Sequence, residues 1–349
     1  MLKARSLSLG KIDRLILFGG GELLVNIARE ARSQGISVFV FAAKRHLAEM
    51  ISVKSRLTLS QALQEIRVQF YSVKDINKSA RLKSLITKSA LGIGLGEAYT
   101  FSDQTISLFG NKIFDFMVIP LPCYRGGAHF TWQILRHDKM GAWNIQVINK
   151  DMVPGVYDSG GIIKTRKYAI PLSARIPQDY FDLAHREGLE IFLDFIREIK
   201  AGKNFSVTPV NETGSTYYPR LFTAIHGFIN WSWNADQIER FICAFDDPYC
   251  GASTFIDGKR VYLKNCKIVR SAGSFHPFMS GLIYRTCNDK VFAACCDHAL
   301  EVKRIVDDKG KSVLESIRPG ERFYTPAKFL EQAMLFNADY NTEGLTRKA

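Results

Sequence analysis

The sequence has 349 residues, with 47 Lys and Arg against 34 Asp and Glu, a formal net charge of +13 and 46% hydrophobic residues. This composition excludes disordered and collagen-like chains, and the length suffices for two or three domains that each bury a core. Residues 1–90 hold 16 basic and 6 acidic side chains, so most of the surplus lies in the N-terminal quarter. An acidic partner is therefore expected at the N-terminal domain.

The cysteines and the apolar runs narrow the class further. The seven cysteines are an odd number and no two have C-x-x-C spacing, so neither a disulfide framework nor a metal site is predicted. No apolar run reaches the roughly 18 to 20 residues of a spanning helix, and Lys11, Asp13 and Arg14 interrupt the first apolar stretch. We expect a cytoplasmic protein without a membrane segment.

The first elements have the pattern of a βαβ unit. An apolar run at 15–18 meets three glycines at 19–21, and apolar positions at helical spacing follow until Gly35. A second apolar run covers 36–42. This order predicts an open α/β fold with a right-handed crossover and a parallel sheet.

The glycine turn at 19–21 is a candidate anion site, because backbone N–H groups at a helix N-terminus point toward a bound phosphate. A dinucleotide fingerprint would need glycine at Leu24 and an acidic residue after the second strand, where Lys44 and Arg45 stand. We therefore expect a close-packed turn that helps bind some anionic group. The cluster from Lys44 to His46 is interpreted as a solvated face.

The second half of the chain has a different pattern of predicted elements. A helical apolar stripe spans 177–200, and the irregular stretch at 203–231 is rich in Asn, Thr, Tyr and Pro. A short helix at 235–245, with Asn234 as N-cap, precedes short strands and tight turns such as Asp257-Gly258. This pattern predicts a small antiparallel barrel. The domains are predicted at 12–205, 206–231 (a connecting loop) and 232–349.

Two motifs carry most of the functional information. The first, LPCYRGGAHFTWQIL, covers 121–135, and the second, DSGGII, covers 158–163. With pieces at 19–24, 216–220 and 231–249, they resemble the folate-dependent formyltransferase family, most closely the bacterial enzymes that formylate amino sugars and less closely methionyl-tRNA formyltransferase. The resemblance implies a Rossmann-like domain with a mainly parallel sheet, followed by a small C-terminal β-barrel-like (OB-like) domain.

The resemblance also implies a reaction and its catalytic residues. In this family an amine attacks the formyl carbon of 10-formyltetrahydrofolate, and Asn and His donate to the oxygen that gains negative charge. An Asp holds the His and helps to move protons, and Asp158 matches it. The Asn position falls on Asp115 and the His position on Met117, so both oxyanion donors are replaced.

These replacements leave two routes to an active site. Loss of one oxyanion donor costs roughly 100- to 1000-fold in turnover, and a thioether such as that of Met117 cannot donate. If Asp115 and Asp158 share a pocket, repulsion raises one pKa, and a protonated Asp115 then donates to the oxyanion while Asp158 accepts a proton. His129 is the other candidate donor, although the favoured interpretation is a helix-start histidine without a role.

Further site residues follow from the resemblance alone. The expected folate contacts are Gly96, Leu121, Arg125, Gly126 and Val156, and the expected substrate contacts are Gly20, Gly21, Tyr217, Tyr218 and Arg220. The loop before Asp158 is longer than usual for the family. It either reshapes the pterin pocket or is a surface insertion.

The sequence thus predicts a formyltransferase-family protein that N-formylates an amino sugar, expected to be nucleotide-linked, with an atypical site. One alternative is a degenerate or repurposed homologue that binds sugar nucleotide or folate without formyl transfer. A second is a tRNA formyltransferase, suggested by the net charge. The motifs favour a small-molecule partner over nucleic acid or membrane, and analogy with the family suggests a homodimer.

Overall fold

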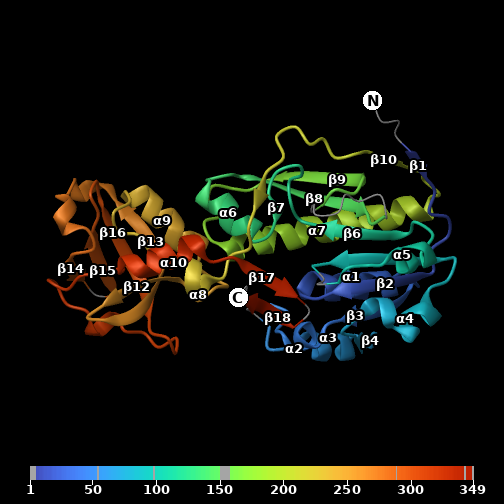
Figure 1. The fold of residues 1–349 in the computed structure, drawn as a ribbon, viewed down its shortest axis with the longest axis horizontal. Coiled ribbons are helices and arrows are strands. Elements are labelled where there is room, and N and C mark those ends of the chain that lie inside the picture. Colours follow the sequence, from blue (N-terminus) through green and yellow to red (C-terminus); the bar gives the residue numbers. More distant parts are fainter. Residues whose placement is uncertain are drawn as a thin grey trace.

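The computed structural model describes residues 5–52, 55–96, 99–149, 158–287, 289–341 and 343–347. A large sheet with helices on both faces forms one part of the molecule, and a small antiparallel β structure forms the other (Figure 1). The C-terminal hairpin lies between them, beside the large sheet. The predicted α/β class followed by a small β domain is confirmed.

The central sheet has seven strands, five of them mutually parallel. The last two run antiparallel to their neighbours and extend the sheet at one edge. In spatial order the strands are β4 (Gln69–Ser72), β3 (Ser37–Ala42), β2 (Arg14–Gly19), β5 (Ala90–Leu95), β6 (Ile113–Met117), β8 (Met140–Val147) and β9 (Ile162–Ala169).

The first βαβ unit matches the prediction. β2 leads through the glycines to α1 (Glu22–Ser33), and β3 then returns parallel to β2. Gly21 is the N-cap of α1 at φ +86°, a backbone conformation that favours glycine. Gly35 closes the helix at φ +78°.

The two faces of the sheet bury different helices because successive strand residues point to opposite sides. Leu15 and Leu17 of β2 pack in the cluster that contains α1 and the long helix α7 (Pro177–Lys200), which has the predicted bounds. Ile16 and Phe18 face the other cluster. That cluster draws on α4 (Ala80–Leu85) and α5 (Asp103–Leu108).

The C-terminal sheet closes into a barrel-like shape. Its five strands are all antiparallel, and the segment at 322–324 bridges both edge strands, through Phe255 to Tyr324 and Leu282 to Arg322. The strands, in spatial order, are β12 (Ala252–Ile256), β13 (Lys259–Val269), β16 (Ala299–Val306), β15 (Lys290–Ala294) and β14 (Ile283–Cys287). α9 (Ala235–Ala244) packs on β13 and starts at Asn234 with a capping box, as predicted.

Several short elements depart from the predicted division of the chain. β1 (Arg5–Leu7) pairs with β10 (Phe205–Val207), so residues before 12 contact the first domain. The predicted connecting loop contains β11 (Tyr217–Tyr218) and α8 (Thr223–His226).

The remaining elements are α2 (Lys44–Ala48), α3 (Leu59–Glu65), β7 (Arg125–Gly126), α6 (His129–Leu135), α10 (Ala327–Leu335), β17 (Ala338–Asn341), β18 (Gly344–Arg347) and single 3₁₀ turns at Ile76–Lys78, Arg270–Ala272, Pro277–Met279 and Leu314–Ser316.

Candidate functional site

Two carboxyl groups, those of Asp115 in the middle of β6 and Asp158 in the turn before β9, lie close enough to interact electrostatically. Asp115 stands opposite Gln146 in the antiparallel pair of β6 and β8, so the two side chains share one face of the sheet. The Gln146 side-chain amide donates to the backbone oxygens of Asp158 at 2.9 Å and Gly160 at 2.7 Å. Gln146 therefore holds the Asp158 turn beside Asp115.

The turn that carries Asp158 depends on a close backbone approach. Asp158 has φ +55°, in the left-handed region that Asp tolerates better than most residues. A Cβ on Gly160 would lie 2.3 Å from the Val147 carbonyl oxygen, so only glycine fits there. The D-S-G-G sequence is thus explained by packing against the end of β8.

The two carboxyls have different electrostatic surroundings. Burial and the neighbouring Asp158 carboxylate raise the pKa of Asp115 to about 7. Burial also raises the pKa of Asp158, but the Gly126 backbone N–H, Arg125 and Arg220 act in the opposite direction. Near neutral pH, a proton shared by the two carboxyls therefore favours Asp115, which lacks the opposing contacts of Asp158.

Met117 gives the site no hydrogen-bond donor. Its side chain is buried, and its cross-strand neighbour is Asn144. The Asn144 amide donates to the Ile119 oxygen at 2.6 Å, and its oxygen accepts from the Thr165 hydroxyl at 2.8 Å. The Asn144 amide is thus already committed to the backbone and to β9.

A short parallel pairing brings two distant motifs to Asp158. β7 pairs with β11, with Arg125 opposite Tyr217 and Gly126 opposite Tyr218. The Gly127 N–H donates to the Tyr218 oxygen at 3.1 Å. Predicted folate residues and predicted substrate residues therefore lie side by side, about 90 residues apart in the chain.

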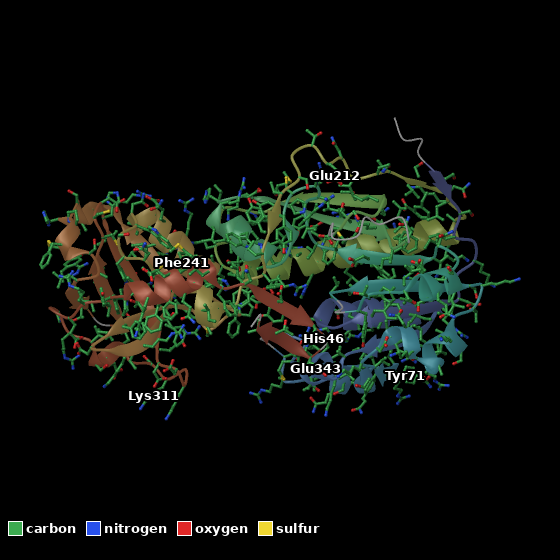
Figure 2. All side chains as sticks on the ribbon, viewed as in Figure 1. His46, Tyr71, Glu212, Phe241, Lys311 and Glu343 are labelled. Atoms are coloured by element: carbon green, nitrogen blue, oxygen red, sulfur yellow. The ribbon has the colours of Figure 1, made fainter. Side chains whose placement is uncertain are left out.

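Arg125 is held by a residue that the sequence analysis missed. Its side chain is 4% exposed and makes a bidentate pair with Glu212, at 2.8 and 2.9 Å. Glu212 lies in the connecting segment above the sheet (Figure 2). Because Glu212 occupies the guanidinium fork, Arg125 acts on the site through its positive charge near Asp158. No local spacing in the sequence links the two residues.

The two tyrosines of β11 have different surroundings. The Tyr218 ring stacks on Tyr124 at 5.2 Å, lies 5.2 Å from Trp132, and its hydroxyl accepts from Arg136. The Tyr217 side chain is 56% exposed. Tyr218 therefore serves the packing of this segment, and Tyr217 is the ring that a ligand can reach.

The glycines of the first turn lie against α2. A Cβ on Gly20 would touch His46 and Leu59 at 3.4 Å. The Gly20 N–H donates to the Leu95 oxygen at 3.4 Å, which joins this turn to Gly96 at the end of β5. Gly20, Gly21 and Gly96 thus share one edge of the sheet with the acid pair.

The described residues fit a folate formyl donor in two respects. Leu121 lines a cavity of about 330 Å³ with Pro122 and residues 162–165. The side-chain oxygens of Gln146 and Asn149 are buried and lack partners within the described chain, so they can accept N–H groups such as those of a pterin. Val156 lies outside the described residues.

His129 starts α6 and is neutral at pH 7, since burial lowers its pKa to about 3. Its Nε2 atom has no partner among the described residues. A neutral imidazole with one such nitrogen can donate or accept one hydrogen bond, but its low pKa makes it a poor base.

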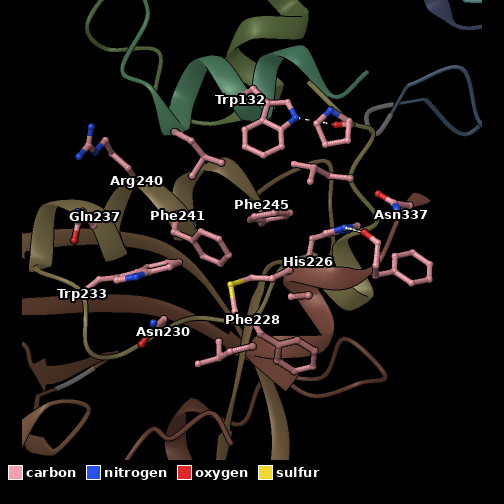
Figure 3. A pocket seen from close by; sticks show the side chains of 17 residues that line it. Trp132, His226, Phe228, Asn230, Trp233, Gln237, Arg240, Phe241, Phe245 and Asn337 are labelled. Atoms are coloured by element: carbon pink, nitrogen blue, oxygen red, sulfur yellow. Dashed lines mark hydrogen bonds between the residues drawn. The ribbon is translucent and has the colours of Figure 1, made fainter. Parts of the chain in front are cut away.

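An apolar cavity of about 560 Å³ lies where the two parts of the molecule meet (Figure 3). Trp132, Phe241 and Phe245 are among its lining residues, and the acid pair is not. The Trp132 indole N–H donates to the Pro219 oxygen at 2.9 Å, and His226 contacts the Phe336 oxygen at 3.0 Å. These contacts tie α6, α8 and the C-terminal segment together.

Within the described ranges, no group of three or more His, Cys, Asp or Glu side chains is arranged to hold a metal ion. Nor does any helix in that part of the chain have the length and apolarity to cross a membrane.

Residues 222–316 match the family model described as "Formyl transferase, C-terminal domain". The methionyl-tRNA formyltransferase of Clostridium botulinum is 24% identical over 191 residues, 55% of this chain and 58% of that protein. The Nitrosomonas europaea enzyme is 25% identical over 214 residues, 58% of this chain and 62% of that protein. The match thus spans about 60% of the length of these relatives.

Solved structures share the fold. An N-formyltransferase from Helicobacter canadensis, in complex with folinic acid and dTDP-3-aminofucose, aligns with a TM-score of 0.58 at 16% identity, over 84% of this chain and 99% of that chain. A sugar 3N-formyl transferase, solved with dTDP and 5-N-formyl-THF, aligns at 0.59 and 14% identity, over 84% and 98%. A 4-N formyltransferase from Francisella tularensis aligns at 0.55 and 16% identity, over 73% and 98%.

Proposed function

Since the chain belongs to the folate-dependent formyltransferase family, we propose that it transfers a formyl group from 10-formyltetrahydrofolate to the primary amine of a nucleotide-linked amino sugar. Two structural neighbours, one in complex with dTDP-3-aminofucose and the other solved with dTDP, support this substrate class. The family relationship supports the type of reaction. The proposed substrate class is argued from the residues of the site.

The observation that carries the proposal is the acid pair. Replacement of Asn by an ionised Asp would repel the oxyanion, by about 4 kcal/mol for charges about 4 Å apart at an effective dielectric of about 20. With its pKa raised to about 7, Asp115 is substantially protonated near neutrality and presents an O–H donor instead. The carboxyl thus takes the place of the missing amide.

The residues then have complementary roles. The donor supplies a formyl group already activated for transfer. The protonated Asp115 donates to the carbonyl oxygen as it gains negative charge, and the ionised Asp158 accepts a proton from the attacking amine. Asp158 then returns that proton to the folate nitrogen, which leaves as its bond to the formyl carbon breaks. Burial raises the pKa of Asp158, and the hydrogen bond from the Gly126 N–H opposes that effect by favouring the carboxylate. Gln146 fixes the position of Asp158 through its backbone.

The substrate would lie along the carboxyl ends of the parallel strands, where open α/β sheets bind ligands. Gly20 and Gly21 provide close backbone approach, Tyr217 an exposed ring for the base, and Arg220 a guanidinium for a phosphate. The excess of basic residues in the first 90 residues suits such an anion.

A non-catalytic binder is the second candidate, because Met117 leaves the site without the usual second donor. A tRNA formyltransferase is the third, because the sequence relatives described above have that activity. If the protein is a tRNA formyltransferase, its binding of tRNA should weaken steeply as the salt concentration rises.

The test compares wild type, Asp158→Asn and the exposed-site control Asp289→Asn. Calorimetry with 5-formyltetrahydrofolate and with dTDP-amino sugars measures binding, and the conversion of 10-formyltetrahydrofolate to tetrahydrofolate in the presence of each sugar measures transfer. We expect Asp158→Asn to lose at least 100-fold in turnover while both ligands still bind. Binding without transfer in the wild type would establish the second candidate instead.

A further inference from the structure

The C-terminal hairpin of β17 and β18 lies on the Rossmann-like domain, although it follows the β domain in the chain. Figure 1 shows both strands beside α2, and Figure 2 shows Glu343 near His46 of that helix. Glu343 forms an ion pair with Lys74, which follows β4. The hairpin therefore returns to the carboxyl edge of the sheet.

Glu343 stands in a cationic pocket. The pocket has a volume of about 630 Å³, and Lys44, Arg45 and Lys74 are its basic residues. Besides Glu343, its other lining residues have small side chains, namely Ala43, Ala48, Ser72 and Val73. Arg45 also pairs with Glu49 at 3.0 Å, and its buried Nε has no partner in the described chain. The pocket thus keeps a net positive charge and an unused donor.

Tyr340 extends the contact from this pocket toward the acid pair. The Arg220 guanidinium lies 5.6 Å from the centre of the Tyr340 ring. Burial raises the pKa of Tyr340, whereas Arg220 and Arg45 act to lower it, so both cations are near the phenol. Arg220 also acts on Asp158. One hairpin thus contacts the cationic pocket and the edge of the proposed catalytic site.

We propose that the pocket of Lys44, Arg45 and Lys74 binds a phosphate or diphosphate group, and that the hairpin at 338–347 is its intramolecular occupant, with the Glu343 carboxylate in place of the phosphate. The proposal rests on the proposed function only for the identity of the natural ligand. A diphosphate carries more charge than one carboxylate and can engage all three cations, so it displaces Glu343.

The contact is suited to displacement. Lys74 and Glu343 are both largely exposed, with side chains 79% and 65% accessible, and exposed ion pairs are weak and screened by salt. Tyr340 is only half-buried and the buried residue Ala338 is small, so detachment of the hairpin exposes little apolar surface. Phosphate binding would therefore uncover Arg220 and open the approach to Asp158.

The experiment titrates full-length protein with inorganic pyrophosphate by calorimetry at low salt. We expect Glu343→Gln to bind about 3- to 10-fold more tightly than wild type, and Lys74→Gln to bind at least 5-fold more weakly. Glu331→Gln on the exposed face of α10 makes the same charge change and should match wild type. Equal affinities for Glu343→Gln and Glu331→Gln, or no pyrophosphate binding by any variant, would overturn the proposal.

Hydrogen exchange provides an independent readout. Pyrophosphate should speed amide exchange in 338–347, and slowed or unchanged exchange there contradicts the displacement. Neither measurement involves formyl transfer. An inactive protein that passes both tests therefore refutes the proposed reaction and leaves the anion site standing.

Discussion

Asp115 lies on β6 and Asp158 in the turn before β9, and burial together with the charge of Asp158 raises the pKa of Asp115 to about 7. Gln146 makes this pairing possible, because it faces Asp115 across the sheet and binds the backbone of Asp158. The pair is therefore a consequence of strand pairing, and in the proposed reaction it supplies one donor and one acceptor.

The first prediction concerns the pH dependence of formyl transfer. Activity should fall as pH rises through about 7, because Asp115 loses the proton that it donates, and should fall again in acid as Asp158 becomes protonated. In Asp115→Asn the amide donates at every pH, so the alkaline fall should disappear. Profiles of kcat/KM for both proteins test this, and an identical alkaline limb in the variant would show that Asp115 is not the donor.

The second prediction restores the family's donors. Asp115→Asn combined with Met117→His should raise turnover with a suitable amino sugar by about 100-fold or more, since the variant holds two oxyanion donors where the wild type holds one. Single-turnover assays at saturating ligands measure the effect. A folded double variant that binds both ligands and gains nothing would refute the view that these two positions limit catalysis.

The third prediction concerns stability. The pKa of Asp115 is about 7 in the folded protein and about 3.9 in an unfolded chain, so its contribution is fully present below about pH 4 and is lost as pH rises through 7. Wild type should lose a few kcal/mol of unfolding free energy between about pH 5 and pH 8. Asp115→Asn should lack most of this slope.

Urea denaturation at several pH values measures that slope, and Asp289→Asn, at an exposed position, is the matched control. If wild type and Asp115→Asn show the same dependence, Asp115 is ionised throughout the range and cannot be the proposed donor.

The fourth prediction concerns Gly126, which has φ +100°. A Cβ there would lie 2.2 Å from the Tyr218 oxygen, so Gly126→Ala should open the pairing of β7 with β11 and move the N–H that supports Asp158. We expect a loss of about 2 kcal/mol or more, together with lower activity. Gly214→Ala is the control, since Gly214 has φ +79° and open space around it. Equal losses of stability in the two variants would argue against the close contact.

The sequence alone determined the elements whose signals are local. The bounds of α7 follow from a helical apolar stripe with Pro177 at its start and Gly202 beyond its end, and the first βαβ unit follows from its glycines. Asp257-Gly258 likewise marks a turn between two strands of the barrel. Such signals depend on a few adjacent residues. The predicted match of Asp115 and Met117 to the family's Asn and His positions also depends on the nearby sequence, because it is counted back from Pro122.

The tertiary structure alone decided which of these residues meet. Glu212 holds Arg125 across 87 residues, Gln146 brings Asp158 to Asp115, and Glu343 reaches Lys74 across 269 residues. These contacts depend on strand order and on where a loop or hairpin returns, and no fixed spacing in the chain encodes them. The sequence predicts that two catalytic groups of the family are replaced, by Asp115 and Met117, and only the fold sets the burial and the neighbouring carboxylate that raise the pKa of Asp115.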